Sequence, residues 1–120
     1  MDEYQELLDS VVSIGSETFR FRGVFERVLM RLGPDDQMKY ASQYAWFEKR
    51  VLKALAAAGI RIVDFQGKLY DPGLPVTPLN LEDFSTEEEL FVQQTIEPVM
   101  MKDERLLKTG TVILGRIEKQ

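Results

Sequence analysis

Three groups of neighbouring carboxylates are the side chains in this sequence that come closest to a chemical site: Asp35 with Asp36, Glu87 to Glu89, and Asp103 with Glu104. Groups of carboxylates can bind a metal ion or transfer protons. However, the chain has no His and no Cys that would complete a ligand set. Adjacent carboxylates at helix starts and in loops are usually solvated, so we expect no metal site.

The side chains available for catalysis are also few. Without His and Cys, the commonest general base and the commonest thiol nucleophile are missing, and carboxylates, Ser, Thr, Tyr and Lys remain. The sequence contains no Gly-rich phosphate loop and no nucleophile elbow. We therefore expect a protein that is not an enzyme and uses no cofactor. A small-molecule site between strands stays open as an alternative, because a sequence does not show a pocket.

The size and net charge of the chain limit the kinds of protein that it can be. A chain of 120 residues is one ordinary domain, or a helical piece with a small β piece attached. The net charge of -5 argues against nucleic-acid binding, which needs clustered Lys and Arg, and favours a protein partner with a basic surface. No basic segment precedes an apolar run at the N-terminus, and no run approaches the roughly 18 apolar residues of a membrane span. We expect a cytoplasmic protein that does not bind membranes.

The strongest pattern is an apolar stripe in steps of four and three residues, which predicts a long amphipathic helix between residues 4 and 32. The stripe consists of Tyr4, Leu7, Val11, Ile14, Thr18, Phe21, Phe25, Val28 and Leu32. Gly15 and Gly23 weaken the helix by about 1 kcal/mol each relative to Ala, so a break or kink would fall at one of them.

A second helix is expected from about Asp35 to Ala58, after a stop at Gly33 and Pro34. Two helices joined by so short a turn are antiparallel neighbours. Their apolar face is wide enough that a second copy would complete a four-helix bundle, with packing inside one chain as the alternative. The expected core of the dimeric bundle is Leu7, Val11, Ile14, Phe21, Phe25, Val28, Leu32, Tyr44, Phe47 and Val51.

After Gly59 the apolar period changes to two, which predicts strands. Prolines make residues 72–78 extended and irregular, and the acidic residues 80–90 are expected to form a solvated connection with a turn at Ser85 or Thr86. Alternation resumes in FVQQTIEPVM, with Val92, Gln94, Ile96 and Pro98 expected on one side. The segments FVQQTIEPVMM and RLLKTGTVILGRI are the expected arms of a hairpin whose tip is residues 102–105.

The expected fold class is therefore α+β, with a helical hairpin at residues 1–58 and a small β-rich head at residues 59–120. This order resembles the GrpE family of nucleotide-exchange factors for DnaK-type heat-shock chaperones, from about Phe21 to Ile117. The resemblance rests on VLKALAAAG at a helix end, IRIVDFQGK, LYDP at Leu69 to Pro72, and TIEPVMMKDERLLKTGTVILGRI as the last hairpin. The ordered combination carries the resemblance, since Asp-Pro alone is common.

The resemblance implies a homodimeric co-chaperone that promotes ADP release by binding the nucleotide-binding domain of a DnaK-type chaperone. The partner contacts that it implies are Leu69, Asp71 and Pro72, by match to the family motif, and Val99, Met100 and Met101, by position. A non-enzymatic dimeric adaptor with a GrpE-like fold and another partner is the alternative.

The chain also departs from the family in three places. The segment from Leu74 to Val76 stands where the family usually has a His and a small residue after Asp-Pro. The segment from Pro98 to Met100 replaces the family's Lys-Gly-Tyr group before the hairpin tip. Because the match begins near Phe21, we expect a short, divergent member that lacks the long N-terminal coiled coil.

Overall fold

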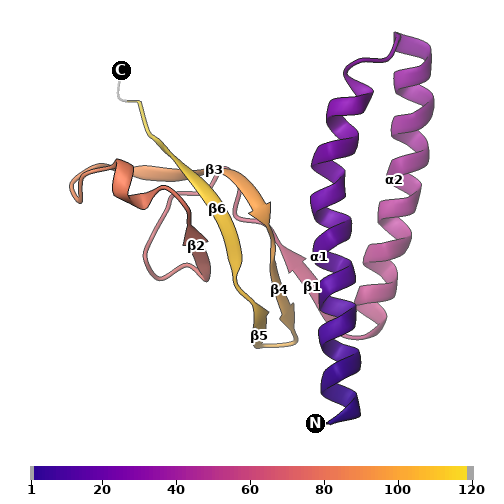
Figure 1. The fold of residues 1–120 in the computed structure, drawn as a ribbon, viewed down its shortest axis with the longest axis horizontal. Helices are drawn as coiled ribbons and strands as arrows, with labels where there is room; N and C mark the ends of the chain where they lie inside the picture. Colours follow the sequence, from indigo (N-terminus) through magenta and orange to yellow (C-terminus); the bar gives the residue numbers. More distant parts are fainter. Residues whose placement is uncertain (1, 119–120) are drawn as a thin grey trace. The chain divides into compact units, whose positions relative to one another are not determined.

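The structure of this protein is a computed structural model that describes residues 2–118. Two long helices precede two small sheets, so the fold class is α+β, as the sequence predicts (Figure 1). The elements are α1 (Glu3–Leu29), α2 (Pro34–Ala57), β1 (Ile60–Val63), β2 (Val76–Pro78), the 3-10 helix η1 (Leu81–Asp83), β3 (Leu90–Glu97), β4 (Val99–Lys102), β5 (Arg105–Lys108) and β6 (Gly110–Arg116). The chain divides into a helical unit and a β unit between Arg61 and Ile62, whereas the sequence placed a boundary after residue 58.

The first helix is continuous through both of its glycines. Asp2 caps it, because its Oδ1 accepts a hydrogen bond from the backbone N–H of Tyr4 at 3.0 Å. Glu3 and Glu6 then lie in the first turn, where the positive end of the helix dipole favours acids. No break occurs at Gly15 or Gly23, since a cost of about 1 kcal/mol per glycine is small for a helix of 27 residues.

The second helix starts at Pro34, where a missing backbone N–H costs nothing. The side-chain amide of Gln37 donates to the carbonyl of Leu29 at 3.1 Å and so closes the turn between the helices. Further along, the rings of Phe25 and Tyr44 stack with centroids 5.1 Å apart. The two helices therefore form the expected antiparallel hairpin (Figure 1).

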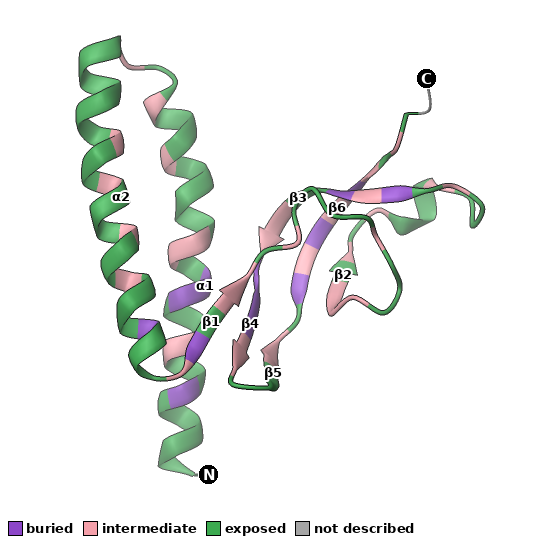
Figure 2. Ribbon diagram, turned by 180° about the vertical axis from the view of Figure 1, so that it is seen from behind, coloured by how far each residue is buried: buried purple, intermediate pink, exposed green. Residues whose placement is uncertain are grey.

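The strands form two three-stranded sheets, in the orders β1-β4-β5 and β2-β6-β3, and the boundary between the two units falls within β1. Strand β6 is central in the second sheet, parallel to β2 and antiparallel to β3. Buried positions alternate with partly buried ones along β6 (Figure 2), because successive side chains of a strand point to opposite faces. The buried core of this sheet consists of Leu90, Val92, Val112 and Leu114.

The predicted hairpin exists, but it is divided between the two sheets. Its outer halves pair as β3 with β6, and its inner halves pair as β4 with β5. Pro98 and Thr109 separate the halves. The tip lies at Asp103 and Glu104, and Asp103 has a left-handed φ of 54°. The sequence therefore predicted the two arms correctly and missed the division between sheets.

β-bulges overturn the predicted face of the first arm. The register shifts between Val92 and Gln94 and again between Thr95 and Glu97. Val92 is fully buried, whereas Gln94 is exposed, so the two residues do not share a buried face. The expectation of simple alternation was wrong because each bulge adds one unpaired residue and changes the face of the residues after it.

The acidic connection before β3 is more ordered than expected. It contains η1, which the sequence did not predict, and then a turn in which the N–H of Glu88 donates to the carbonyl of Ser85 at 3.3 Å. The carboxylate of Glu88 also accepts a hydrogen bond from Arg116 Nε at 2.9 Å. The turn at Ser85 is thus confirmed, but the segment is tied to β6 through Arg116.

The Glu88–Arg116 contact predicts a pH dependence of stability. The hydrogen bond from Arg116 lowers the pKa of Glu88 below its ordinary value of 4.5. The contribution of the Glu88–Arg116 contact to stability is therefore complete above the pKa that Glu88 has in the unfolded chain. It is lost as the pH falls through the lower pKa that Glu88 has in the folded chain. We expect Glu88→Gln to flatten the fall of the urea midpoint below about pH 4.5. Glu87→Gln is the control. If the urea midpoint falls equally with pH in both variants, the contact between Glu88 and Arg116 is not the source of the pH dependence.

The side chain of Asn80 continues the sheet beyond the end of β2. Its Oδ1 accepts from the N–H of Leu114 at 2.9 Å, and its Nδ2 donates to the carbonyl of Leu114 at 3.0 Å. The amide thus pairs with β6 as a backbone residue would. Because β2 is only three residues long, this pair also lengthens the shortest strand contact of the sheet.

Asn80→Asp tests this contact. The carboxylate cannot donate to the carbonyl of Leu114, so a half-buried acceptor loses its partner and faces a negative charge. We expect a loss of about 1–3 kcal/mol in the free energy of unfolding, measured by urea denaturation. Gln94→Glu makes the same chemical change at an exposed position and should cost far less. Equal effects of the two substitutions would show that the Asn80 pair contributes nothing.

Candidate functional site

The main candidate for a functional surface in the helical unit is an apolar face that the chain leaves uncovered. Both helices are exposed along much of their length (Figure 2). Leu7 and Ile14 on α1 are 68% and 65% exposed, and Trp46 on α2 is 62% exposed. Exposed apolar groups that gather over several turns mark interaction surfaces in soluble proteins. We call this surface the hairpin face and define it by Tyr4, Leu7, Ile14, Phe21, Val28, Tyr40, Trp46 and Phe47.

The residues predicted for a bundle core divide into two sets. The partly buried set is Val11, Phe25, Leu32, Tyr44 and Val51. The exposed set is Leu7, Ile14, Phe21, Val28 and Phe47, and it belongs to the hairpin face. A single chain therefore buries only part of the predicted stripe.

A row of four aromatic rings packs between the two helices and includes two residues of the hairpin face. Ring centroids are 6.2 Å apart for Phe21 and Phe25, 5.1 Å for Phe25 and Tyr44, and 5.9 Å for Tyr44 and Phe47. The hydroxyl of Tyr44 donates to the carbonyl of Thr18 at 3.4 Å. Burial, and then the charge of Glu48, raises the pKa of Tyr44 above 10.0, so the phenol remains neutral. The row joins the two helices and fixes the exposed rings at its ends.

The hairpin face is hollowed in two places. One hollow of about 340 Å³ lies over both helices, between Ile14, Phe21 and Phe47. The other, of about 510 Å³, lies along α2 beside Trp46 and Phe47. Because exposed rings and hollows occur on the same face, it can receive side chains as well as insert them.

The β unit carries the partner contacts that the resemblance implies. Leu69 is 67% exposed, and Asp71 and Pro72 are exposed as well. Asp71 Oδ1 accepts from the N–H of Gly73 at 2.9 Å, and its carbonyl accepts from the N–H of Leu74. Asp71 and Pro72 thus form a turn that holds Leu69 at the surface beside β3.

The three residues chosen by position lie on β4, and two of them are not at the surface. Val99 and Met100 are buried, at 1% and 0% exposure, while Met101 is partly exposed. Val99 and Met100 point to opposite faces of β4, so both faces of the strand are covered at its start. We therefore withdraw Val99 and Met100 as contact residues. Met101 belongs to a different sheet from β3, beside which Leu69 lies.

One exposed residue near the hairpin tip was missed. Leu106 on β5 is 46% exposed, and β5 is an edge strand of its sheet. The sequence signal was the pair of leucines directly after the charged tip, since one of two neighbours in an edge strand points to solvent. Asp103 and Glu104 form the turn at the tip, whereas Lys102 and Arg105, also expected there, pair with each other in β4 and β5.

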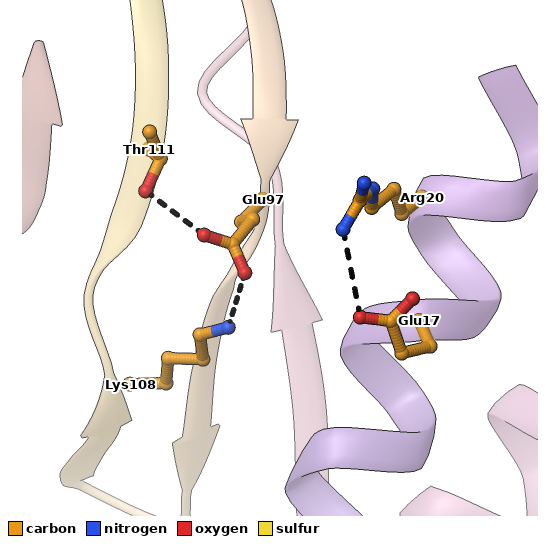
Figure 3. A network of polar contacts seen from close by, with 5 residues as sticks. All are labelled: Glu17, Arg20, Glu97, Lys108 and Thr111. Atoms are coloured by element: carbon orange, nitrogen blue, oxygen red, sulfur yellow. Dashed lines mark hydrogen bonds and ion pairs between the residues drawn. The ribbon is translucent and has the colours of Figure 1, made fainter. Parts of the chain in front are cut away.

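A polar network fixes the place where the hairpin divides. Glu97 accepts hydrogen bonds from Lys108 Nζ at 2.7 Å and from Thr111 Oγ1 at 3.3 Å (Figure 3). These contacts join the end of β3 to β5 and β6. Figure 3 also shows the pair of Glu17 and Arg20 on α1, whose charged atoms are 3.7 Å apart.

An open groove of about 730 Å³ in the β unit lies between Phe84, Phe91 and Gly115, and Arg116 lies 4.9 Å from the ring of Phe84. Within residues 2–118, no group of acidic, His or Cys side chains is arranged to hold a metal ion. No helix within residues 2–118 is long and apolar enough to cross a membrane. Comparisons of the chain with protein-family models, with curated proteins and with solved structures found no match.

Proposed function

We propose that this chain is a dimeric GrpE-like co-chaperone, which promotes ADP release by binding the nucleotide-binding domain of a DnaK-type heat-shock chaperone in the cytoplasm. The observation that carries the proposal is the hairpin face, the uncovered apolar side of two long helices. These helices are followed by a β unit that ends in a β-hairpin. This is the order of elements on which the resemblance to the GrpE family rests.

The energetics of the exposed face support the proposed dimer. Each large apolar side chain gains about 1.5–3 kcal/mol when it is fully buried. A second copy offers an identical face, and two helical hairpins packed through such faces form a four-helix bundle. In this bundle Leu7, Ile14, Phe21 and Phe47 become core residues, which a single chain leaves in water.

Exchange of this kind needs no catalytic group. A protein that binds the open form of a two-lobed domain more tightly than the closed form shifts the population toward the open form, and bound ADP loses contacts. The β unit would have to act as a rigid body. The Glu97 network and the turn at Asp71 supply rigidity, while Leu69, Met101 and Leu106 supply apolar contacts at the surface.

The proposal is tested first by binding. A complex with the nucleotide-binding domain of a DnaK-type chaperone should form without nucleotide and dissociate when ATP is added, as measured by gel filtration or calorimetry. Leu69→Glu should weaken this complex by more than about tenfold, because a carboxylate would be desolvated at the contact. Leu81→Glu, at another exposed leucine of the β unit, is the matched control. Binding that ATP does not affect would contradict the proposal.

The burial of Val99 and Met100 favours one alternative, because the resemblance places these residues at the chaperone contact. In this alternative the chain is a dimeric adaptor with a GrpE-like arrangement and another protein partner. It predicts the same dimer, but neither ATP-sensitive binding nor faster release of ADP.

A further inference from the structure

Two charged lines of opposite sign border the hairpin face. On α1, an acidic line of exposed residues runs through Glu3, Glu6, Ser10, Ser13 and Glu17. On α2, a basic line of exposed residues runs through Lys39, Gln43, Trp46, Arg50 and Lys53. Both lines advance in steps of three and four residues, so each keeps to one side of its helix. Trp46 belongs to both the basic line and the hairpin face, and the other residues of the hairpin face lie between the two lines.

The charge pattern extends over the full length of each helix. Up to residue 19, α1 carries acids and no Lys or Arg, whereas its second half contains Arg20, Arg22 and Arg27, and Arg31 follows its end. The pattern in α2 is the reverse, because Asp35 and Asp36 stand at its start and the basic line follows. In an antiparallel hairpin the acidic half of α1 is therefore level with the basic half of α2.

Contacts inside one chain define which residues are level with each other. Arg22 lies 3.6 Å from Glu48, and Phe25 stacks on Tyr44. Moving back by about one turn of α1 and forward by about one turn of α2 places Glu17 level with Arg50 and Lys53. None of these three side chains is buried, and the guanidinium of Arg50 lies 4.6 Å from the ring of Trp46.

We infer that, in the dimer of the proposed function on which this inference rests, α1 of one protomer lies antiparallel beside α2 of a second copy of this chain. The acidic line of each protomer then faces the basic line of the other, and Glu17 pairs with Arg50 and Lys53 across the interface. The two-fold axis runs along the bundle, so both complementary edges form at once. Trp46 of each protomer approaches the hollow beside Ile14 and Phe21 of the other.

Other arrangements of the four helices place like charges together. If α2 packed beside the second α2, Lys39, Arg50 and Lys53 would meet their own copies. If α1 packed beside the second α2 in the opposite direction, Arg27 and Arg31 would lie near Arg50 and Lys53. Facing like charges are destabilising, and pairs of charges at the edges of helical bundles set partner and orientation.

Charge reversal provides the test. One variant is Glu17→Lys, and the other is the double substitution Arg50→Glu with Lys53→Glu. Each homodimer would face like charges at two edges, so its dissociation constant, measured by sedimentation equilibrium, should rise by roughly tenfold or more. When the two variants are mixed in equal amounts, each edge of the heterodimer between them again pairs residues of opposite charge. We therefore expect this heterodimer to form with nearly wild-type affinity. Lys49→Glu, which lies outside the basic line, is the control and should dimerise as the wild type does.

The oligomeric state of the wild type and the preference for the heterodimer test the dimer and the charge pairing separately. A wild-type chain that stays monomeric at tens of micromolar overturns the dimer itself, and this inference with it. A wild-type dimer whose variants show no preference for the heterodimer overturns the pairing of the lines and leaves the dimer intact. Preferential heterodimers support the pairing.

Cross-linking gives an independent measurement, because the chain has no native cysteine. Ser13→Cys mixed with Lys53→Cys should form a disulfide between the two variants under mild oxidation, since the two positions lie on facing edges. Ser13→Cys alone should cross-link at least roughly tenfold more slowly, because its two copies lie on opposite edges of the bundle. Fast cross-linking of Ser13→Cys alone would overturn the arrangement.

Discussion

Gly110→Val is expected to lower the stability of the β unit by about 3 kcal/mol or more, because position 110 has no room for a side chain. A Cβ at this position would lie 3.1 Å from the carbonyl oxygen of Glu97 and 3.1 Å from Val99 Cγ2. The first of these atoms belongs to the backbone of β3 and cannot rotate away. Gly110 is buried at the start of β6, where the hairpin divides. Any shift there also disturbs its hydrogen bond to the carbonyl of Pro75.

Urea denaturation followed by circular dichroism measures this effect. Gly23→Ala is a suitable control, because a Cβ at Gly23 meets nothing within 4 Å and the position is helical. That substitution should stabilise the helical unit by up to about 1 kcal/mol. An unchanged midpoint for Gly110→Val would show that β3 and β6 separate more readily than the structure indicates.

Phe21→Asp is expected to raise the dissociation constant of the dimer by more than about 100-fold, since it places an unpaired carboxylate in the core of the four-helix bundle. Phe21 is 52% exposed in the single chain and borders the hollow beside Ile14 and Phe47. The charge is therefore tolerated in the monomer and excluded from the interface. Sedimentation velocity over a range of concentrations measures the change.

The matched control is Met30→Asp, a change from an exposed apolar residue to the same carboxylate. Met30 is 79% exposed and lies at the end of α1, outside the hairpin face. It should leave the dimer intact. A Phe21→Asp chain that remains dimeric would show that the hairpin face is not the interface.

The helical unit was largely predictable from the sequence, since both helices follow from a stripe in steps of three and four. Gly33 and Pro34 also predicted the turn between them. The division of the apolar stripe into an inner and an exposed set was not predictable. It depends on the rotation of one helix against the other, which the contact between Phe25 and Tyr44 settles in the folded chain.

The β unit was less predictable because its pairing is set by residues far apart in the sequence. The arms of the hairpin follow from alternation around a charged tip, but the bulges near Gln94 and Met101 leave no local mark. The first bulge moved Gln94 off the buried face of Val92, and Met100, predicted at the surface, is buried on β4 before the second bulge. The role of Asn80 as a partner of Leu114 was equally hidden, because an Asn shortly after a strand usually indicates only a turn.

The most direct measurement of the central claim is the release of a fluorescent ADP analogue from a DnaK-type chaperone of the same source, followed by stopped flow. We expect the wild-type dimer to accelerate release at micromolar concentration, the Leu69→Glu variant not to do so, and the Leu81→Glu variant to act as the wild type does. If a folded wild-type dimer does not accelerate the release, the exchange function is contradicted. The dimeric adaptor with another protein partner is then the remaining proposal.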